Sequence, residues 1–362
     1  RDCLLSRGLG DVYKRQTPAN LQWIDPRGKC ESLAQGIAPA DLDDRDLLVV
    51  LDTSAWAQLG AMGEVLKRRR ERVVVVDHHV RIETLPAPDS KAEIISDSYQ
   101  VGGPVPTALA FLSLLKTKTS FIGRWSTDEQ GQLIKSDLKQ SGIDTNLAIE
   151  KPEGRSGFAH VWVEAKTGRR SIAAYRGSHI ITPEDLEYIN WGDYNVLHLD
   201  GWSTHAAIAA ANKIKAVGGL VFLDLGSPKK KLEDLLRTVD IVNCPLKLLK
   251  KLYPKEDLKH AAQRLFDMGI SELSVTDGEQ GAWLVDSDGI NFQKAFNVKS
   301  LDTNGAGDVF CGAMIYASMM NLKSDYRLRF ASAAAAIKCC SIGNRDALPN
   351  LKKIESFIEQ NS

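Results

Sequence analysis

The sequence predicts an α/β protein: a doubly wound parallel sheet flanked by helices, with a small β-lid and an N-terminal α/β fragment. From residue 96 on, short apolar runs that end in polar or glycine residues alternate with stretches of helical periodicity. This alternation is typical of β-α-β units and of a sheet covered on both faces. Two strand-like runs surround Lys166-Thr167-Gly168 and predict a hairpin. Near the N-terminus, residues 47–60 and 72–79 predict a strand, a helix and a second strand.

Four apolar runs form the predicted sheet, at residues 194–200, 219–226, 239–244 and 272–278. Predicted helices follow at 205–217, 229–239, 246–253 and, later in the chain, 308–320. Two more helices are expected at 330–343 and 348–360, and the predicted hairpin covers 160–175. Because ligands of open α/β sheets bind outside the carboxyl ends of the strands, the functional site is expected at that edge.

The composition excludes several classes of function. The chain has 362 residues, of which 43% are hydrophobic and 25% are charged, as in ordinary globular proteins. Its formal net charge is zero, so nothing indicates nucleic acid as a partner. No uninterrupted apolar run is long enough to span a membrane. The six cysteines lack zinc-ligand spacing and fit a reducing, cytoplasmic compartment.

The most informative segment is Leu301–Asp308, LDTNGAGD, which stands directly before the apolar run VFCGAMIYASMM. The small residues let backbone amides approach an anion without an intervening Cβ atom. A helix N-terminus adds N–H groups without helical partners and a partial positive charge. Asp308 would stand where a carboxylate can accept a proton from an attacking hydroxyl. This combination suits phosphoryl transfer.

The string resembles the signature of the ribokinase-like (PfkB) family of ATP-dependent sugar kinases, and other segments support the resemblance in the family's order. Residues 274–285, SVTDGEQGAWLV, resemble the strand-turn-strand on the nucleotide side. Residues 101–115, VGGPVPTALAFLSLL, resemble the Gly-Gly turn and helix at the sugar site. Residues 121–144 resemble the G-x-D-x-x-G helix segment that follows, and residues 81–94 resemble the start of the lid. The resemblance covers about residues 80–362.

The resemblance implies ATP and Mg²⁺ as cofactors, a sugar or sugar-acid substrate and the following site residues. Asp308 would be the base, with Gly305, Ala306 and Gly307 presenting amides to the developing charge. On the nucleotide side the matching residues are Asp302, Thr303, Thr276, Gly278, Gly281 and Asn243. On the sugar side they are Asp77, Gly102, Gly103 and Arg176, the last within AYRGS, which resembles the Tyr-Arg element of 2-keto-3-deoxygluconate kinases. A homodimer formed through the lid would also be consistent with the resemblance.

The chain departs from the family pattern at three places. Leu246 stands where an N-x-x-E motif beginning at Asn243 would have its glutamate near the magnesium shell. Pro104 and Thr107 stand near positions where the family often has asparagines. Valines precede Asp77, where the family usually has a glycine.

The N-terminal residues suggest a different origin. Residues 1–16 resemble a non-native read-end segment, with no apolar core of a signal peptide. Residues 17–79 resemble a truncated fragment of the DHH phosphoesterase family, because LDTS and the DHH triplet match motifs of its manganese site. The matching ligands would be Asp52, Asp77 and one of His78 and His79, and such oxygen and imidazole ligands suit manganese. Asp77 can therefore belong either to this fragment or to the sugar site of a kinase.

Three functions remain open from the sequence. The first is an ATP-dependent sugar kinase, the second is a manganese phosphoesterase acting on short oligonucleotides, and the third is an inactive chimera. The second would lack the earlier aspartate motif, expected upstream of Asp52, and the later half of its site, so we expect no phosphodiesterase activity from residues 17–71.

Overall fold

The computed structural model describes residues 48–51, 73–76, 99–163, 170–345 and 347–361. The chain divides into two compact units, residues 1–97 and 98–362. In the first unit, strands β1 (Leu48–Leu51) and β2 (Val73–Val76) pair in parallel, with Leu48 opposite Val73. The two strands of the predicted strand-helix-strand unit are thus confirmed, and the residues between them lie outside the described ranges.

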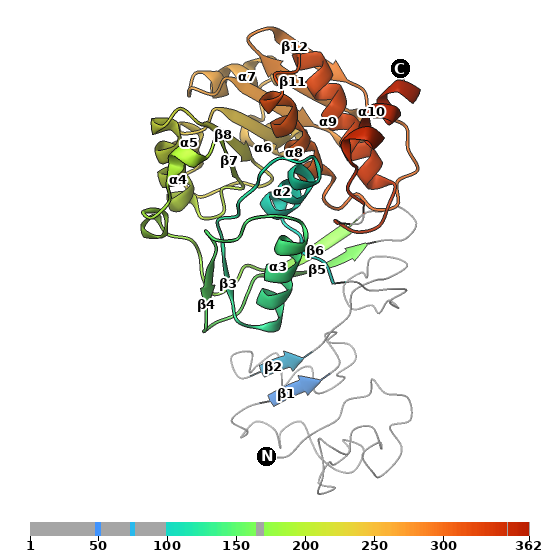
Figure 1. Cartoon of the computed structure of the whole chain (residues 1–362). Helices are drawn as coiled ribbons and strands as arrows, with labels where there is room; N and C mark the ends of the chain where they lie inside the picture. Colours follow the sequence, from blue (N-terminus) through green and yellow to red (C-terminus); the bar gives the residue numbers. More distant parts are fainter. Residues whose placement is uncertain (1–47, 52–72, 77–98, 164–169, 346, 362) are drawn as a thin grey trace, which may run out of the picture. The chain divides into compact units, whose positions relative to one another are not determined.

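The second unit is built on a six-stranded sheet with the order β12-β11-β10-β9-β8-β7 (Figure 1). Strands β7 (Val196–Leu199), β8 (Leu220–Asp224), β9 (Ile241–Pro245) and β10 (Glu272–Thr276) are parallel, as predicted. Strands β11 (Ala282–Asp286) and β12 (Gly289–Gln293) then add in antiparallel order. The sheet is therefore mixed, with a parallel part and a two-stranded antiparallel edge.

Helices cover both faces of this sheet. One face packs against α4 (Thr204–Ala216), α5 (Leu232–Leu236), α6 (Leu246–Leu252) and α7 (Leu258–Phe266). The other packs against α2 (Pro104–Leu114), α3 (Glu129–Gln140), α8 (Ala306–Met319), α9 (Ser324–Cys339) and α10 (Leu351–Gln360). Successive side chains of strand β8 point to opposite faces of the sheet. Val221 and Leu223 pack in the core on the α4–α7 side, and Phe222 packs in the core on the α2 and α3 side.

Smaller elements lie outside the main sheet. Strands β3 (Arg124–Ser126) and β4 (Ile149–Lys151) pair in parallel, and β5 (Phe158–Val163) and β6 (Arg170–Tyr175) form the predicted antiparallel hairpin. Short 3₁₀ turns occur at Pro183–Leu186, Trp191–Asp193 and Gly278–Gln280.

The segment resembling the G-x-D-x-x-G helix is held by its aspartate. Asp128 caps α3, accepting a 2.9 Å hydrogen bond from the Gly131 amide and another from the Ser156 amide. Burial opposes ionisation, but these hydrogen bonds keep the pKa of Asp128 below its ordinary value. Because a Cβ atom at Gly131 would lie 1.8 Å from the Ser126 carbonyl oxygen, only glycine fits there. This aspartate and glycine fix where the helix begins.

Candidate active site

The glycine-rich turn leads directly into helix α8. Gly305 precedes the helix with a φ of 77°, and Ala306, Gly307 and Asp308 form its first turn. A Cβ atom at Gly305 would lie 2.7 Å from Asn344 Oδ1, whereas a Cβ atom at Gly307 would meet nothing within 4 Å. Gly305 is therefore required by the fold, and Gly307 faces open space beside the N–H groups of the helix terminus.

The residues before the glycines hold the turn in shape. Asp302 is buried, and its carboxylate accepts hydrogen bonds from the amides of Asn304, at 2.8 Å, and Gly343, at 2.9 Å. The amides of Leu301 and Asp302 both donate to the carbonyl of Cys339, at 2.8 and 3.2 Å. The carbonyl of Thr303 accepts from the amide of Ala306 at 3.3 Å. The carboxylate of Asp302 thus binds the protein's own backbone.

Asp308 lies near a second carboxylate at the carboxyl end of β8. Burial and then the negative charge of Asp308 raise the pKa of Asp224 to about 7. Burial and both carboxylates also raise the pKa of Cys311, on the next turn of α8. Two adjacent carboxyl groups do not readily ionise together. Burial and the neighbouring carboxylate therefore favour the protonated form of Asp224, and Asp308 is the less buried member of the pair.

A chain of hydrogen bonds runs from Asp224 across the neighbouring strands. The Asn243 amide nitrogen donates to Asp224 Oδ1 at 3.0 Å, and Ser274 Oγ donates to Asn243 Oδ1 at 2.9 Å. The three residues stand opposite one another on β8, β9 and β10 and are all buried. Asn243, expected on the nucleotide side, therefore engages both ends of its amide within the sheet.

The predicted nucleotide-side loop is the tight connection between β10 and β11. Thr276 is the last residue of β10 and stands opposite Ala282, and the Asp277 amide donates to the Gly281 carbonyl at 2.8 Å. Gly281 has a φ of 126°, and a Cβ atom there would lie 2.2 Å from the Gln293 carbonyl oxygen. Gly278 is exposed with open space around it. Gly281 thus shapes the loop, and Gly278 leaves its tip accessible.

The predicted sugar-side glycines precede helix α2, where Gly103, with a φ of 99°, caps the N-terminus. Asn344 joins this segment to the glycine-rich turn. The backbone N–H of Asn344 donates to Gln100 Oε1. The Asn344 side-chain oxygen accepts a hydrogen bond from the side-chain nitrogen of Asn304 at 3.2 Å. A Cβ atom at Gly102 would lie 3.0 Å from the Asn344 side-chain nitrogen. The structure thus brings the Gly102 segment and the Gly305 turn against one side chain.

Arg176 follows β6, and its guanidinium lies 4.7 Å from the centroid of the Trp202 ring, just after β7. Burial lowers the pKa of Lys229; the charge of Asp200 opposes this shift and that of Arg176 adds to it. The hairpin therefore places Arg176 close to a second cation at the carboxyl-end edge of the sheet. The predicted residues Asp77, Asp52, His78 and His79 lie outside the described residues.

Sequence reasoning missed two residues that support the glycine-rich turn, Lys338 and Asn344. Lys338 is the only charged residue in the run 331–340, ASAAAAIKCC, and this isolation in an apolar helix was the available signal. Asn344 carries no comparable signal, because its importance arises from contacts between segments far apart in the chain.

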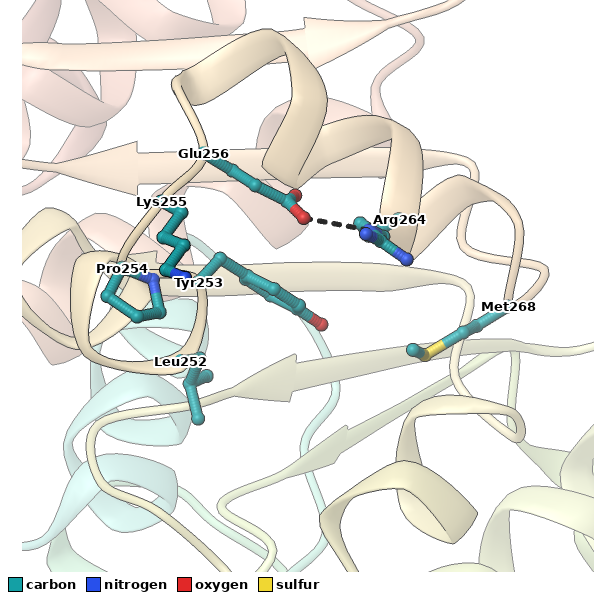
Figure 2. A pocket seen from close by; sticks show the side chains of 7 residues that line it. All are labelled: Leu252, Tyr253, Pro254, Lys255, Glu256, Arg264 and Met268. Carbon is teal, nitrogen blue, oxygen red and sulfur yellow. Dashed lines mark hydrogen bonds and ion pairs between the residues drawn. The ribbon is translucent and has the colours of Figure 1, made fainter.

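A surface pocket of about 340 Å³ lies elsewhere, at the turn between α6 and α7 (Figure 2). Its lining includes Tyr253, Met268 and the ion pair between Arg264 and Glu256, whose nitrogen and oxygen atoms are 2.8 Å apart. None of the predicted site residues lines it. Within the described residues there is also no group of three or more His, Cys, Asp or Glu side chains arranged to hold a metal ion. Those residues include no helix that is both long and apolar enough to cross a bilayer.

Comparisons with known proteins agree with this geometry. The sequence model described as pfkB family carbohydrate kinase matches residues 70–351. An uncharacterized sugar kinase from Archaeoglobus fulgidus is 29% identical over 248 residues, which are 66% of this chain and 98% of that protein. A putative ribokinase from Agrobacterium tumefaciens has a TM-score of 0.68 at 25% identity, covering 78% of this chain and 93% of its own. A putative ribokinase II from E. coli, solved with ATP and Mg²⁺, has a TM-score of 0.67 at 21% identity. The match covers 78% of this chain and 96% of the E. coli chain.

The family match begins at residue 70 and so includes residues 73–79, which the sequence analysis assigned to a phosphoesterase-like fragment. The comparisons give no support to such a fragment. Since the match spans well over half of the sequence, the chain belongs to the pfkB family of carbohydrate kinases.

Proposed function

We propose that this chain transfers the γ-phosphoryl group of ATP to a hydroxyl group of a sugar or sugar acid, with Asp308 as the general base. The observation that carries the proposal is the placement of Asp308 in the first turn of α8, beside the buried Asp224. The raised pKa of Asp224 favours the protonated form of that group, and Asp308 stands where a carboxylate can accept the proton of the attacking hydroxyl.

The glycine turn supplies the second element of the mechanism. In phosphoryl transfer the protein contributes mainly positioning and electrostatic stabilisation. The amides of Gly305, Ala306 and Gly307 stand at the positive end of α8, and the open space at Gly307 admits an anion close to the backbone. This end of the helix would stabilise the negative charge that develops on the transferred group.

The nucleotide would bind on the side of the β10–β11 loop, near Thr276, Gly278 and Gly281. Mg²⁺ bound to ATP would neutralise charge on the β- and γ-phosphate oxygens. Mg²⁺ is commonly held by one or two carboxylates and by phosphates rather than by a complete protein cage.

Arg176 supports a substrate that carries a carboxylate. A guanidinium suits a carboxylate because it can donate two parallel hydrogen bonds. Its position over Trp202 and near Lys229 gives this edge of the site two positive charges. We therefore infer a preference for a sugar acid over a neutral sugar, with Gly102 and Gly103 bordering the sugar.

The test is a panel of neutral sugars and sugar acids assayed for ADP release with ATP and Mg²⁺. We expect phosphorylation of at least one sugar acid, with turnover lower on the order of a hundredfold or more in Asp308→Asn. Arg176→Met should raise KM for the acid much more than KM for any neutral sugar. A chain that phosphorylates only neutral sugars, with Arg176→Met as active as the parent, would exclude the sugar-acid preference. The phosphoesterase alternative predicts manganese-dependent phosphodiester hydrolysis that is lost in Asp52→Ala, and we expect none.

A further inference from the structure

Helix α9 contains a lysine that is completely removed from solvent. The side chain of Lys338 is 0% exposed, and it lies one residue before the helix end at Cys339. Lysine is almost never fully buried unless it is paired, because an ammonium group loses a large hydration energy on burial. The proposed phosphoryl-transfer chemistry does not use this group directly, so its burial requires another explanation.

The ammonium group of Lys338 is directed at the catalytic turn. Its nitrogen donates to the backbone carbonyl of Asp302 at 2.9 Å and lies 3.6 Å from Asp302 Oδ2. The carboxylate of Asp302 is also buried, at 6% exposure. The same carboxylate holds the amide of Asn304 on one side and the amide of Gly343 on the other. One cation therefore contacts both the backbone and the side chain of the residue that organises the turn.

We propose that Lys338 is a positioning residue of the phosphoryl-transfer site: its ammonium group is an internal counter-cation that fixes Asp302 and thereby aims the amides of Gly305–Gly307 at the transferred group. This inference rests on the proposed function for its catalytic consequence. Asp302 is only three residues before Gly305, and its carboxylate oxygens are shared between the turn and the segment after α9. Without the cation, the buried carboxylate would lack its neutralising charge and the turn would lose one of its fixed points.

The first test measures the turn itself and needs no enzyme activity. Amide hydrogen exchange is compared between Lys338→Met, which keeps an unbranched apolar side chain, and the matched control Lys353→Met on the exposed face of α10. We expect faster exchange in the segments 301–308 and 341–344 in Lys338→Met, with strands β8–β10 unchanged. The control should match the parent throughout. Parent-like exchange of both segments in Lys338→Met would overturn the proposal.

The second test separates positioning from a purely structural role. In Lys338→Met we expect kcat to fall on the order of tenfold to a hundredfold, with little change in KM, because small misplacement of transition-state contacts lowers turnover. The double variant Lys338→Met/Asp302→Asn removes both buried charges and should recover most of the lost thermal stability without recovering kcat. Recovery of kcat together with stability would show that the pair only holds α9 to the turn.

The double variant also provides the folded comparison if the single variant does not fold, since its exchange at 301–308 should still exceed that of the parent. Parent-like exchange there would refute the positioning role. If the parent phosphorylates no sugar, the proposed function fails, and the exchange measurement still decides whether Lys338 fixes the turn.

Discussion

Two glycines of the catalytic turn should respond in opposite ways to the same substitution. Gly305 has a φ of 77°, in the left-handed region, and a Cβ atom there would lie 2.7 Å from Asn344 Oδ1. The left-handed conformation costs an alanine about 1–2 kcal/mol, and forcing an atom into a packed site costs a further ~1–3 kcal/mol. Gly305→Ala should therefore lower the free energy of unfolding by about 2–5 kcal/mol.

Gly307→Ala should leave stability unchanged or raise it. Gly307 is helical, and a Cβ atom there would meet nothing within 4 Å. Replacing glycine by alanine inside a helix gains about 0.5–1 kcal/mol, and less in the first turn. The same methyl group would enter the space that we assign to the transferred phosphoryl group. Turnover should therefore fall on the order of tenfold or more, because anion-stabilising contacts of this kind are worth several kcal/mol.

Chemical denaturation and ADP release, measured on both variants and the parent, check this pair. Only the combination of a stable, impaired Gly307→Ala and an unstable Gly305→Ala agrees with the assigned roles. A Gly307→Ala variant with parental turnover would refute the anion site. A Gly305→Ala variant as stable as the parent would refute the argument from backbone conformation.

Three further predictions follow from the charges of the described residues. Asp308→Asn should keep its fold and ATP binding but lose turnover on the order of a hundredfold or more; near-parental turnover would remove Asp308 as the base. The pKa of Asp224 is raised from 3.8 to about 7, so between these pH values the folded state binds a proton that the unfolded state has released. The free energy of unfolding should therefore fall by up to a few kcal/mol as pH rises through this window. Denaturation measured at several pH values should show a smaller dependence on pH for Asp224→Asn. Arg327→Met should lower the free energy of unfolding by about 3–5 kcal/mol, because the buried Glu272, 2.6 Å from the guanidinium, loses its partner. Arg237→Met removes one member of an exposed ion pair and should lower the free energy of unfolding by less than about 1 kcal/mol. Equal losses in chemical denaturation would contradict the role of burial.

The parallel part of the sheet could be predicted because each strand is a short apolar run with a clear end. Helix α7 was missed although its signal is present: Asp257 caps it through the His260 amide, at 2.9 Å, and apolar residues recur at helical spacing. Strand β12 was missed because it is short and its residues alternate between half-buried and exposed, without an apolar run. The strand-turn-strand predicted at residues 274–285 matches β10 and β11, whereas the outermost strand, β12, became evident only from the structure.

The candidate site also has a part that the sequence predicts and a part that only the structure reveals. Asp308 and its glycines follow from a local pattern, since a turn and a helix start need only neighbouring residues. The pairing of Asp308 with Asp224 and the burial of Lys338 depend on which helix packs over which strand. No local pattern specifies that packing, so the electrostatic partners of the site could not be assigned from the sequence. Whether Asp77 and Arg176 contact substrate stays a prediction.

The contacts of Asn344 have a consequence for biosynthesis. This residue joins Gln100 to the Asn304 turn, although 244 residues separate it from Gln100 in the sequence. Contacts between such distant segments form late, because a long loop must close before they stabilise anything. Strands β7–β10 can assemble before residue 344 is synthesised, whereas the two sides of the site come together only after residue 344 has emerged. A nascent chain arrested before residue 344 should thus contain much of its sheet and yet lack the contacts that join the Gln100 segment to the Asn304 turn.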